Sequence, residues 1–236
     1  MQVSQIFLSD VADDLSPYLN RCVEGIKRLH PTFSHTLYNN QTLREFIVTN
    51  FDDAVVAAYD KLIPYSYKSD LGRYCLLYKL GGWYFDISVS VLSQVEISDG
   101  IEFIVYRDIQ NNSRSSWAVN GGVIFSKPNN PIFKTAIDTV VKHCLDEYYG
   151  ITPLCPTGPT VLGHAIAMHG VNPNAVIGDL QILTPIRKKR NVAFVLPGGT
   201  IHGFAKPSSG GDLKSLGTRG TNNYNELYFS RNVYRR

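Results

Sequence analysis

A helix-to-strand turn near the middle of the chain constrains its fold more than any other feature. Before the turn, apolar side chains recur at the helical spacing i, i+3, i+4 and i+7, at Leu71, Tyr74, Cys75 and Tyr78. Residues 81–82 are Gly-Gly, which suits the left-handed end of a helix because glycine enters that region without steric cost. We predict a helix that Ser66 or Ser69 caps and that ends at this pair, followed at once by a strand.

The strand predicted after the turn alternates over residues 83–92. One face carries Trp83, Phe85, Ile87, Val89 and Val91, and the other carries Tyr84, Asp86, Ser88, Ser90 and Leu92. Burying a carboxylate at the end of a strand costs free energy unless a cation compensates its charge. Two kinds of cation could compensate Asp86. A metal ion carrying a phosphate is one, and an arginine in a purely structural ion pair is the other.

These residues resemble the sugar-binding region of glycosyltransferases with a D-x-D motif. That group includes an initiating mannosyltransferase of yeast, bacterial capsule and lipopolysaccharide transferases, and clostridial glucosylating toxins. Its pattern is an S/A-D-x-x-R helix leading into G-G-x-Y-x-D-x-D, matched here by Ser69, Asp70, Arg73, Gly81, Gly82, Tyr84 and Asp86. Ser88 stands where the second Asp belongs, and its hydroxyl can bind a hard cation but brings no charge.

The resemblance implies an α/β protein with the GT-A fold, in which helices flank a Rossmann-like, mostly parallel sheet. We expect one catalytic domain over residues 1–236. Residues 1–95 would form the nucleotide-binding half, 96–197 the donor and acceptor half, and 198–236 a C-terminal loop that closes over the donor. The expected activity transfers a hexose or N-acetylhexosamine from a nucleotide-diphosphate sugar to a saccharide during cell-surface glycan synthesis, with retention of configuration. A UDP-sugar is the favoured donor, and GDP-mannose remains open.

The resemblance also implies a metal site for Mn²⁺ or Mg²⁺. Asp86 would hold the ion and Ser88 would assist through its hydroxyl or a water molecule. A polar residue of the C-terminal loop would complete the shell, for which Asn222 and Asn223 are candidates.

Three further residues would act on the donor sugar. Asp70 would accept hydrogen bonds from sugar hydroxyls, and Arg73, three residues later on the same helix, would orient Asp70 or contact the donor. Asn120 would lie beside the reacting carbon, although the Asn-Gly-Gly sequence there also fits a simple bulge.

The resemblance implies nucleotide contacts at Phe7 and Ser9 after the first strand and at Asn39 after the second, and the start of a helix at Gly158 is a further candidate. Tyr84 of the matched motif is another, and Lys206 or Arg219 of the C-terminal loop could meet the diphosphate. Phe7 equally fits a core position, and Gly158 a capping turn. His202 is a further candidate ligand or phosphate contact.

The rest of the chain has the pattern of an α/β domain. Helices are predicted at 16–29, 42–50, 52–62, 131–149 and 160–168, and strands at 3–8, 35–39, 101–106, 117–126, 182–183 and 192–196. No G-x-G-x-x-G, G-x-S-x-G or P-loop motif appears, so nicotinamide, hydrolase and P-loop chemistry lack support.

Composition narrows the partners. The net charge of +3 and one short basic cluster, Arg187–Arg190, are too little to indicate nucleic acid. Four scattered cysteines without C-x-x-C, no leader pattern and no apolar run of membrane-spanning length predict a cytoplasmic protein with reduced thiols. A lipid-linked acceptor would then require peripheral membrane contact, for which Tyr148, Tyr149 and residues 231–236 are candidates.

Two alternatives remain open. The chain is a non-catalytic nucleotide-sugar or carbohydrate-binding protein if Ser88 marks a decayed metal site. It is a protein-modifying glycosyltransferase if the acceptor is a protein.

Overall fold

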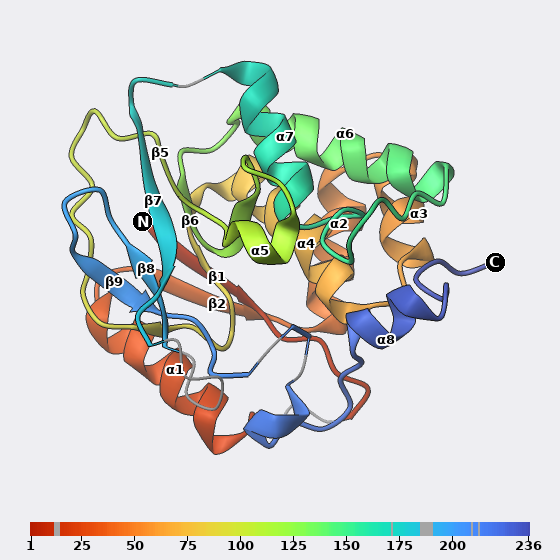
Figure 1. The fold of residues 1–236 in the computed structure, drawn as a ribbon, viewed down its shortest axis with the longest axis horizontal. Coiled ribbons are helices and arrows are strands. Elements are labelled where there is room, and N and C mark those ends of the chain that lie inside the picture. The colour runs from red at the N-terminus through yellow and green to blue at the C-terminus, as the bar shows by residue number, and fades with distance from the viewer. Residues whose placement is uncertain (12–14, 171, 185–190, 209, 212) are drawn as a thin grey trace.

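The computed structural model describes residues 1–11, 15–170, 172–184, 191–208, 210–211 and 213–236. It has helices on both faces of a central sheet (Figure 1), which confirms the predicted α/β class. The basic cluster at 187–190 lies outside the described residues.

Nine strands of the described residues form one mixed sheet. In order across the sheet they are β2 (Ser34–Tyr38), β1 (Gln2–Ile6), β3 (Gly82–Phe85), β6 (Val119–Ser126), β5 (Phe103–Arg107), β7 (Ala175–Ile182), β8 (Val192–Val195), β9 (Ile201–Phe204) and β4 (Ser90–Val91). β1 runs parallel to β2 and β3, and β5 runs parallel to β7, whereas the other neighbours are antiparallel.

The direction of β6 decides where the functional edge of the sheet lies. Because β6 is antiparallel to both β3 and β5, its beginning lies beside the ends of those two strands. Tyr106 pairs with Asn120 and Phe85 with Val123, so residues that follow β3 and β5 meet the start of β6. The end of β1 points to the same edge because β1 is parallel to β3.

Helices cover the two faces of the sheet unequally. α1 (Pro17–Leu29) packs on one face, where Ile26 meets the side chains of Trp83 and Phe85. The other face carries α2 (Asn40–Asn50), α3 (Asp53–Lys61), α4 (Tyr65–Leu80), α6 (Pro131–Leu145), α7 (Pro159–His169) and α8 (Tyr224–Phe229). Two short turns remain, α5 (Gln110–Ser113) and a 3-10 turn (Lys214–Leu216).

The predicted turn between α4 and β3 is confirmed. Gly81 and Gly82 have φ values of +62° and +82°, and a Cβ on Gly82 would collide with the backbone of Gln2 in β1. The predicted serine cap is wrong, because Pro64 occupies the N-cap position and Ser66 and Ser69 lie inside the helix. Pro64 has an extended backbone conformation that starts the helix without a side-chain hydrogen bond.

The strand after that turn is shorter than predicted. β3 ends at Phe85, and the expected alternation through residue 92 is wrong because residues 86–89 form a turn. The Asp86 N–H donates to the carbonyl of Gly122 (2.7 Å), and the Val89 N–H donates to the carbonyl of Asp86 (3.0 Å). The chain therefore leaves the sheet at Asp86, so the Asp86 side chain projects from a turn and not from a strand.

Other expectations hold to within a few residues. Ser16 and Asp52 cap α1 and α3, and all four cysteines are free and buried. α6 stops at Leu145 rather than Tyr149. β7 begins seven residues before the predicted 182–183, and β9 was not predicted from the glycine-rich tail. Of the helices in the described residues, none combines the length and apolar content needed to cross a bilayer.

Candidate active site

A cavity of about 780 Å³ opens at the edge where β1, β3 and β5 end and β6 begins. Its wall includes Phe7 and Leu8, the first half of α4, the turn at 86–89, and the segments 108–109 and 120–122. The loop at 151–154 and residues between 205 and 229 complete it. The volume lies within the range of sites for small organic ligands, about 300–1,000 Å³.

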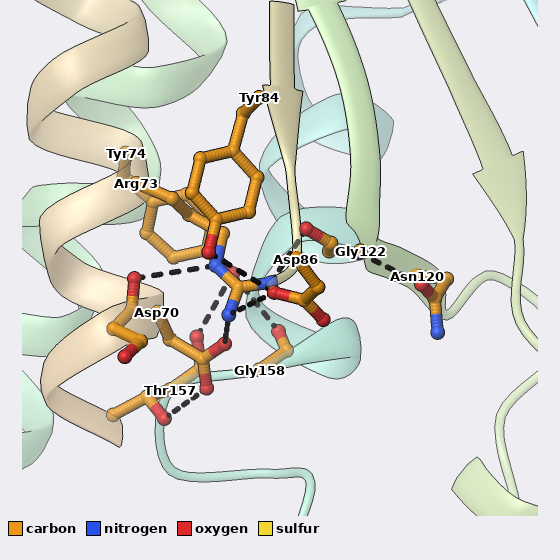
Figure 2. A network of polar contacts seen from close by, with 11 residues as sticks. Asp70, Arg73, Tyr74, Tyr84, Asp86, Asn120, Gly122, Thr157 and Gly158 are labelled. Atoms are coloured by element: carbon orange, nitrogen blue, oxygen red, sulfur yellow. Dashed lines mark hydrogen bonds and ion pairs between the residues drawn. The ribbon is translucent and has the colours of Figure 1, made fainter. Parts of the chain in front are cut away.

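The centre of the cavity wall is the guanidinium of Arg73 (Figure 2). Its Nη2 lies 3.1 Å from Asp70 Oδ1 and 3.2 Å from Asp86 Oδ1. Its Nε donates to the carbonyl of Ser69 (3.2 Å), and its Nη1 donates to the carbonyl of Gly121. The side chain is only 7% exposed. Because each guanidinium nitrogen already has a protein partner, the geometry favours an orienting role for Arg73 over direct contact with a ligand.

Asp70 is held from two sides. Arg73 contacts one carboxylate oxygen, and the Thr157 hydroxyl donates to the other at 2.7 Å. Burial raises the pKa of Asp70 to about 6, against the lowering effect of Arg73 and Thr157. Gly158 lies beside it, since a Cβ there would be 3.3 Å from Asp70 Oδ2. Thr157 belongs to the Thr-Gly-Pro sequence at the start of α7, from which only Gly158 was predicted as a site residue.

Asp86 presents its two oxygens differently. Oδ1 accepts a hydrogen bond from the Tyr84 hydroxyl (3.0 Å) and contacts Arg73, whose guanidinium lies 4.8 Å from the Tyr84 ring centre. Oδ2 lies on the side of Gly122, 3.1 Å from where a Cβ on that glycine would be. With 39% of its side chain exposed, Asp86 is the open member of the cluster.

The residues at this turn suit a hard divalent cation. Mg²⁺ is often bound by one or two carboxylates together with substrate phosphates rather than by a cage of protein ligands. Asp86 and Ser88 both line the cavity, and their side chains bear a carboxylate and a hydroxyl. The described residues contain no group of three or more His, Cys, Asp or Glu side chains able to hold a metal ion. Water molecules, hydroxyls and substrate phosphates are the other ligands that a hard cation accepts.

Asn120 lies at the start of β6, as the register requires. Its Oδ1 accepts a hydrogen bond from the Gly122 N–H (2.8 Å), and its Nδ2 donates to Asp108 Oδ1 (3.4 Å). Asp108 also lines the cavity, and burial raises its pKa. Asp108 was not among the predicted site residues, although, like Asn39, it is a polar residue directly after a strand.

The other sequence candidates divide into two groups. Phe7, Tyr84, Gly158, Lys206 and Asn222 line the cavity, whereas Ser9, Asn39 and Asn223 do not.

The three candidates outside the cavity have structural contacts. Asn39 forms a capping box with Thr42, and Asn223 caps α8 by accepting from the Asn225 N–H (3.0 Å). The Ser9 hydroxyl donates to the carbonyl of Arg219 (3.0 Å).

Asn222 and His202 are also engaged elsewhere. The Asn222 amide joins the Tyr65 N–H (2.9 Å) to the Ile63 carbonyl (3.2 Å), so it ties the C-terminal segment to the start of α4. His202 is buried in the other face of the sheet, with Nδ1 2.7 Å from the Tyr106 hydroxyl, and burial lowers its pKa to about 4. The suggested ligand role of His202 is wrong because its ring does not reach the cavity.

Comparison with known proteins finds a likeness in the part of the chain that holds Asp70, Arg73 and Asp86. Residues 16–108 match the family described as "Glycosyltransferase sugar-binding region containing DXD motif". This part of the chain, less than half of its length, is similar to a glycosyltransferase sugar-binding region. The matched residues include α4, β3, the turn at Asp86 and Asp108.

Curated relatives are also glycosyltransferases. The chain is 27% identical over 123 residues to an uncharacterized glycosyltransferase of Acanthamoeba polyphaga mimivirus, which covers 52% of the chain and 47% of the relative. It is 39% identical over 62 residues to inositol phosphoceramide mannosyltransferase 3 of Schizosaccharomyces pombe, over 26% of the chain and 17% of that protein. The chain thus spans less than half of the length of these relatives.

A solved structure supports the fold. The structure described as "PaToxG Glycosyltransferase" superposes with a TM-score of 0.54 at 18% identity, covering 71% of this chain and 68% of the other. At this identity the likeness concerns the fold alone, and it agrees with the α/β architecture expected from the sequence.

Proposed function

We propose that the chain transfers a hexose or N-acetylhexosamine from a nucleotide-diphosphate sugar, with a UDP-sugar favoured, to a saccharide acceptor. One observation carries this proposal: Arg73 holds Asp70 and Asp86 together in the wall of a ligand-sized cavity, in the part of the chain that is similar to a glycosyltransferase sugar-binding region. Asp70 would accept hydrogen bonds from hydroxyls of the donor sugar. Phe7, Tyr84, Gly158 and Lys206 are proposed donor contacts because all four line the cavity.

Mn²⁺ or Mg²⁺ is the proposed metal, held by Asp86 with Ser88 as the auxiliary ligand. When bound, the ion would neutralise the leaving diphosphate. Asn222 and Asn223 fit this shell poorly, because their amides already bind backbone groups. Transfer with retention remains a proposal from the resemblance, and we assign no side chain as a base.

The same residues explain how the site stays organised between turnovers. Arg73 fixes both carboxylates from a buried position, so their geometry does not depend on a bound ligand. The Thr157 hydroxyl favours the ionised form of Asp70, which is the form that accepts hydrogen bonds from sugar hydroxyls. The Tyr84 hydroxyl holds Asp86 Oδ1, and the other carboxylate oxygen, Oδ2, lies beside Gly122.

Nucleotide release from a panel of UDP- and GDP-sugars, with Mn²⁺ or with EDTA, tests the proposal. We expect one donor to be hydrolysed or transferred in a metal-dependent way. Asp86→Asn should reduce release by about 100-fold or more, the scale for losing one preorganised electrostatic contact. Asp138→Asn, which removes an exposed carboxylate of α6, is the matched control. Binding of a donor without release in the presence of saccharides would instead support the non-catalytic alternative.

A second test concerns the acceptor. We propose that acceptors are presented at a membrane surface, because Ile151 and Phe229 are 72% and 74% exposed at the rim of the cavity and Arg231 lies close by. Sedimentation with anionic lipid vesicles should then be weakened by Phe229→Ser and unaffected by Met168→Ser, a similarly exposed residue of α7. Transfer to a purified protein rather than to saccharides would favour the protein-modifying alternative.

A further inference from the structure

Asp108 occupies the sheet edge two strands away from Asp86. It follows β5 directly, and its N–H donates to the carbonyl of Ala118 (2.8 Å), so pairing between β5 and the start of β6 fixes its backbone. Asp108 is one of the residues that line the cavity. This position is set by the antiparallel insertion of β6 and does not depend on a flexible loop.

Asn120 separates Asp108 from the Asp86 carboxylate. A Cβ built on Gly122 would lie 2.9 Å from Asn120 Oδ1 and 3.1 Å from Asp86 Oδ2, so these two oxygens flank one point of the wall. The Asn120 amide group then reaches away from Asp86 to Asp108 Oδ1 at 3.4 Å. Figure 2 shows Gly122 between Asp86 and Asn120. The wall therefore runs from Asp86 through Asn120 to Asp108.

Asp108 and the Asp70 cluster face the same interior. Burial raises the pKa of Tyr224 to about 12, and the negative charges of Asp70 and Asp108 add to the effect. Tyr224, Asp70 and Asp108 all line the cavity.

Asp86 and Asp108, at the two ends of the wall, differ in whether a cation compensates their charge. Asp70 and Asp86 share the guanidinium of Arg73. Among the residues that the structure describes, Asp108 forms no ion pair, and its carboxylate accepts hydrogen bonds from the Asn120 amide and the Ile109 N–H. A largely buried carboxylate without a cation is costly, and such groups are concentrated at functional sites.

We propose that Asp108, oriented by Asn120, binds a hydroxyl group of the acceptor saccharide. The inference rests on the proposed function, in which Asp70 and Asp86 hold the donor and Asn120 lies beside its reacting carbon. The side of Asn120 away from Asp86 is then where a second substrate approaches that carbon. An ionised carboxylate accepts strong hydrogen bonds from hydroxyls and repels phosphate groups. The site therefore suits a neutral, hydroxyl-bearing acceptor.

Comparison of transfer with donor hydrolysis in Asp108→Asn tests this assignment. Transfer to the best of a panel of mono- and disaccharides and hydrolysis of the same donor are measured on one preparation. We expect the ratio of transfer to hydrolysis to fall by about 10- to 100-fold, the worth of a hydrogen bond to a charged group. The Michaelis constant of the acceptor should rise more than that of the donor.

Two variants control for other effects. Asp179→Asn removes a carboxylate from β7, the neighbour of β5, and breaks only an exposed ion pair with Arg107, so its ratio should equal that of the wild type. Asp108→Glu retains the charge and shifts it by one methylene, so its ratio of transfer to hydrolysis should lie between those of the wild type and Asp108→Asn. It replaces Asp108→Asn in the test if that variant fails to fold.

The outcomes separate this inference from the proposed function. An unchanged ratio in Asp108→Asn, or an equal loss of transfer and hydrolysis, overturns the acceptor assignment while leaving the enzyme in place. Donor hydrolysis by the wild type without transfer to any saccharide also overturns it. No turnover of any donor by the wild type contradicts the proposed function itself.

Discussion

Replacing Arg73 with methionine tests whether the site is held together by one buried charge. Removing one partner of a buried ion pair costs about 3–5 kcal/mol because it leaves an uncompensated charge. Here the change affects two carboxylates and also removes the donor to the Gly121 carbonyl. Since Asp70 can relieve part of the strain by binding a proton, we expect a loss of about 4 kcal/mol at pH 8. That is a large part of a typical domain stability of about 5–15 kcal/mol.

The loss of unfolding free energy caused by Arg73→Met should depend on pH. Asp70 has a folded pKa of about 6, raised above its usual value near 3.8, so burying its ionised form lowers the stability by an amount that is absent below pH 3.8 and complete above pH 6. At pH 8 the Asp70 carboxylate is charged and depends on Arg73. At pH 4.5 it is mostly protonated in the folded protein, and the loss caused by Arg73→Met should be smaller.

Chemical unfolding at the two pH values measures both losses. Arg73→Lys keeps the charge but lacks the planar group that reaches both carboxylates and two carbonyls, so it should lose about half as much. It also provides a folded sample if the methionine variant is too unstable. A loss below about 1 kcal/mol at pH 8, or one that is the same at pH 4.5, would refute the reasoning.

Three further predictions concern the surroundings of this cluster. The transfer rate should rise with pH around pH 6, as Asp70 ionises. Thr157→Val removes a hydrogen-bond donor to Asp70 and should move this rise to higher pH by about half a unit in pH–rate profiles. A rise at the same pH in the variant would contradict the assignment. Gly163→Ala should cost about 2–3 kcal/mol of unfolding free energy, because a Cβ on α7 would collide with the Trp117 carbonyl, and wild-type stability would disprove that contact. Ser88→Asp places a second carboxylate in a buried position, so its melting temperature should fall in EDTA and recover with Mn²⁺. Recovery without metal would argue against a metal site there.

The parts of the site that depend on residues close together in the sequence could be predicted. Helical spacing placed Asp70 next to Arg73, and Gly81 and Gly82 have the positive φ values that the turn required. Alternation could not show that β3 stops at Phe85, because residues 85–89 keep the apolar–polar pattern of a strand while the backbone turns. The turn is set by the Gly122 carbonyl, which belongs to a strand more than thirty residues away.

Contacts between distant segments explain the remaining misses. Asn39 and Asp108 both follow strands, and only the structure shows that Asn39 caps the next helix whereas Asp108 lines the cavity. Asn39 is the N-cap of α2, which begins at the next residue, whereas α5 begins at Gln110 with Ile109 as its N-cap, so the Asp108 side chain does not cap a helix. β9 escaped prediction because its four residues are too few, and too rich in glycine and histidine, to form an apolar pattern.

The hydrogen bonds of the final residues have a consequence for synthesis. Val233 and Arg235 pair with the backbone at Ile63 and Lys61, just before α4. Tyr224 and Phe229, which precede them, form part of the cavity wall. Asp70 and Asp86 stand much earlier in the sequence and are synthesised well before this segment. A nascent chain that already carries both carboxylates therefore lacks one side of the pocket until Tyr224 and Phe229 have been added.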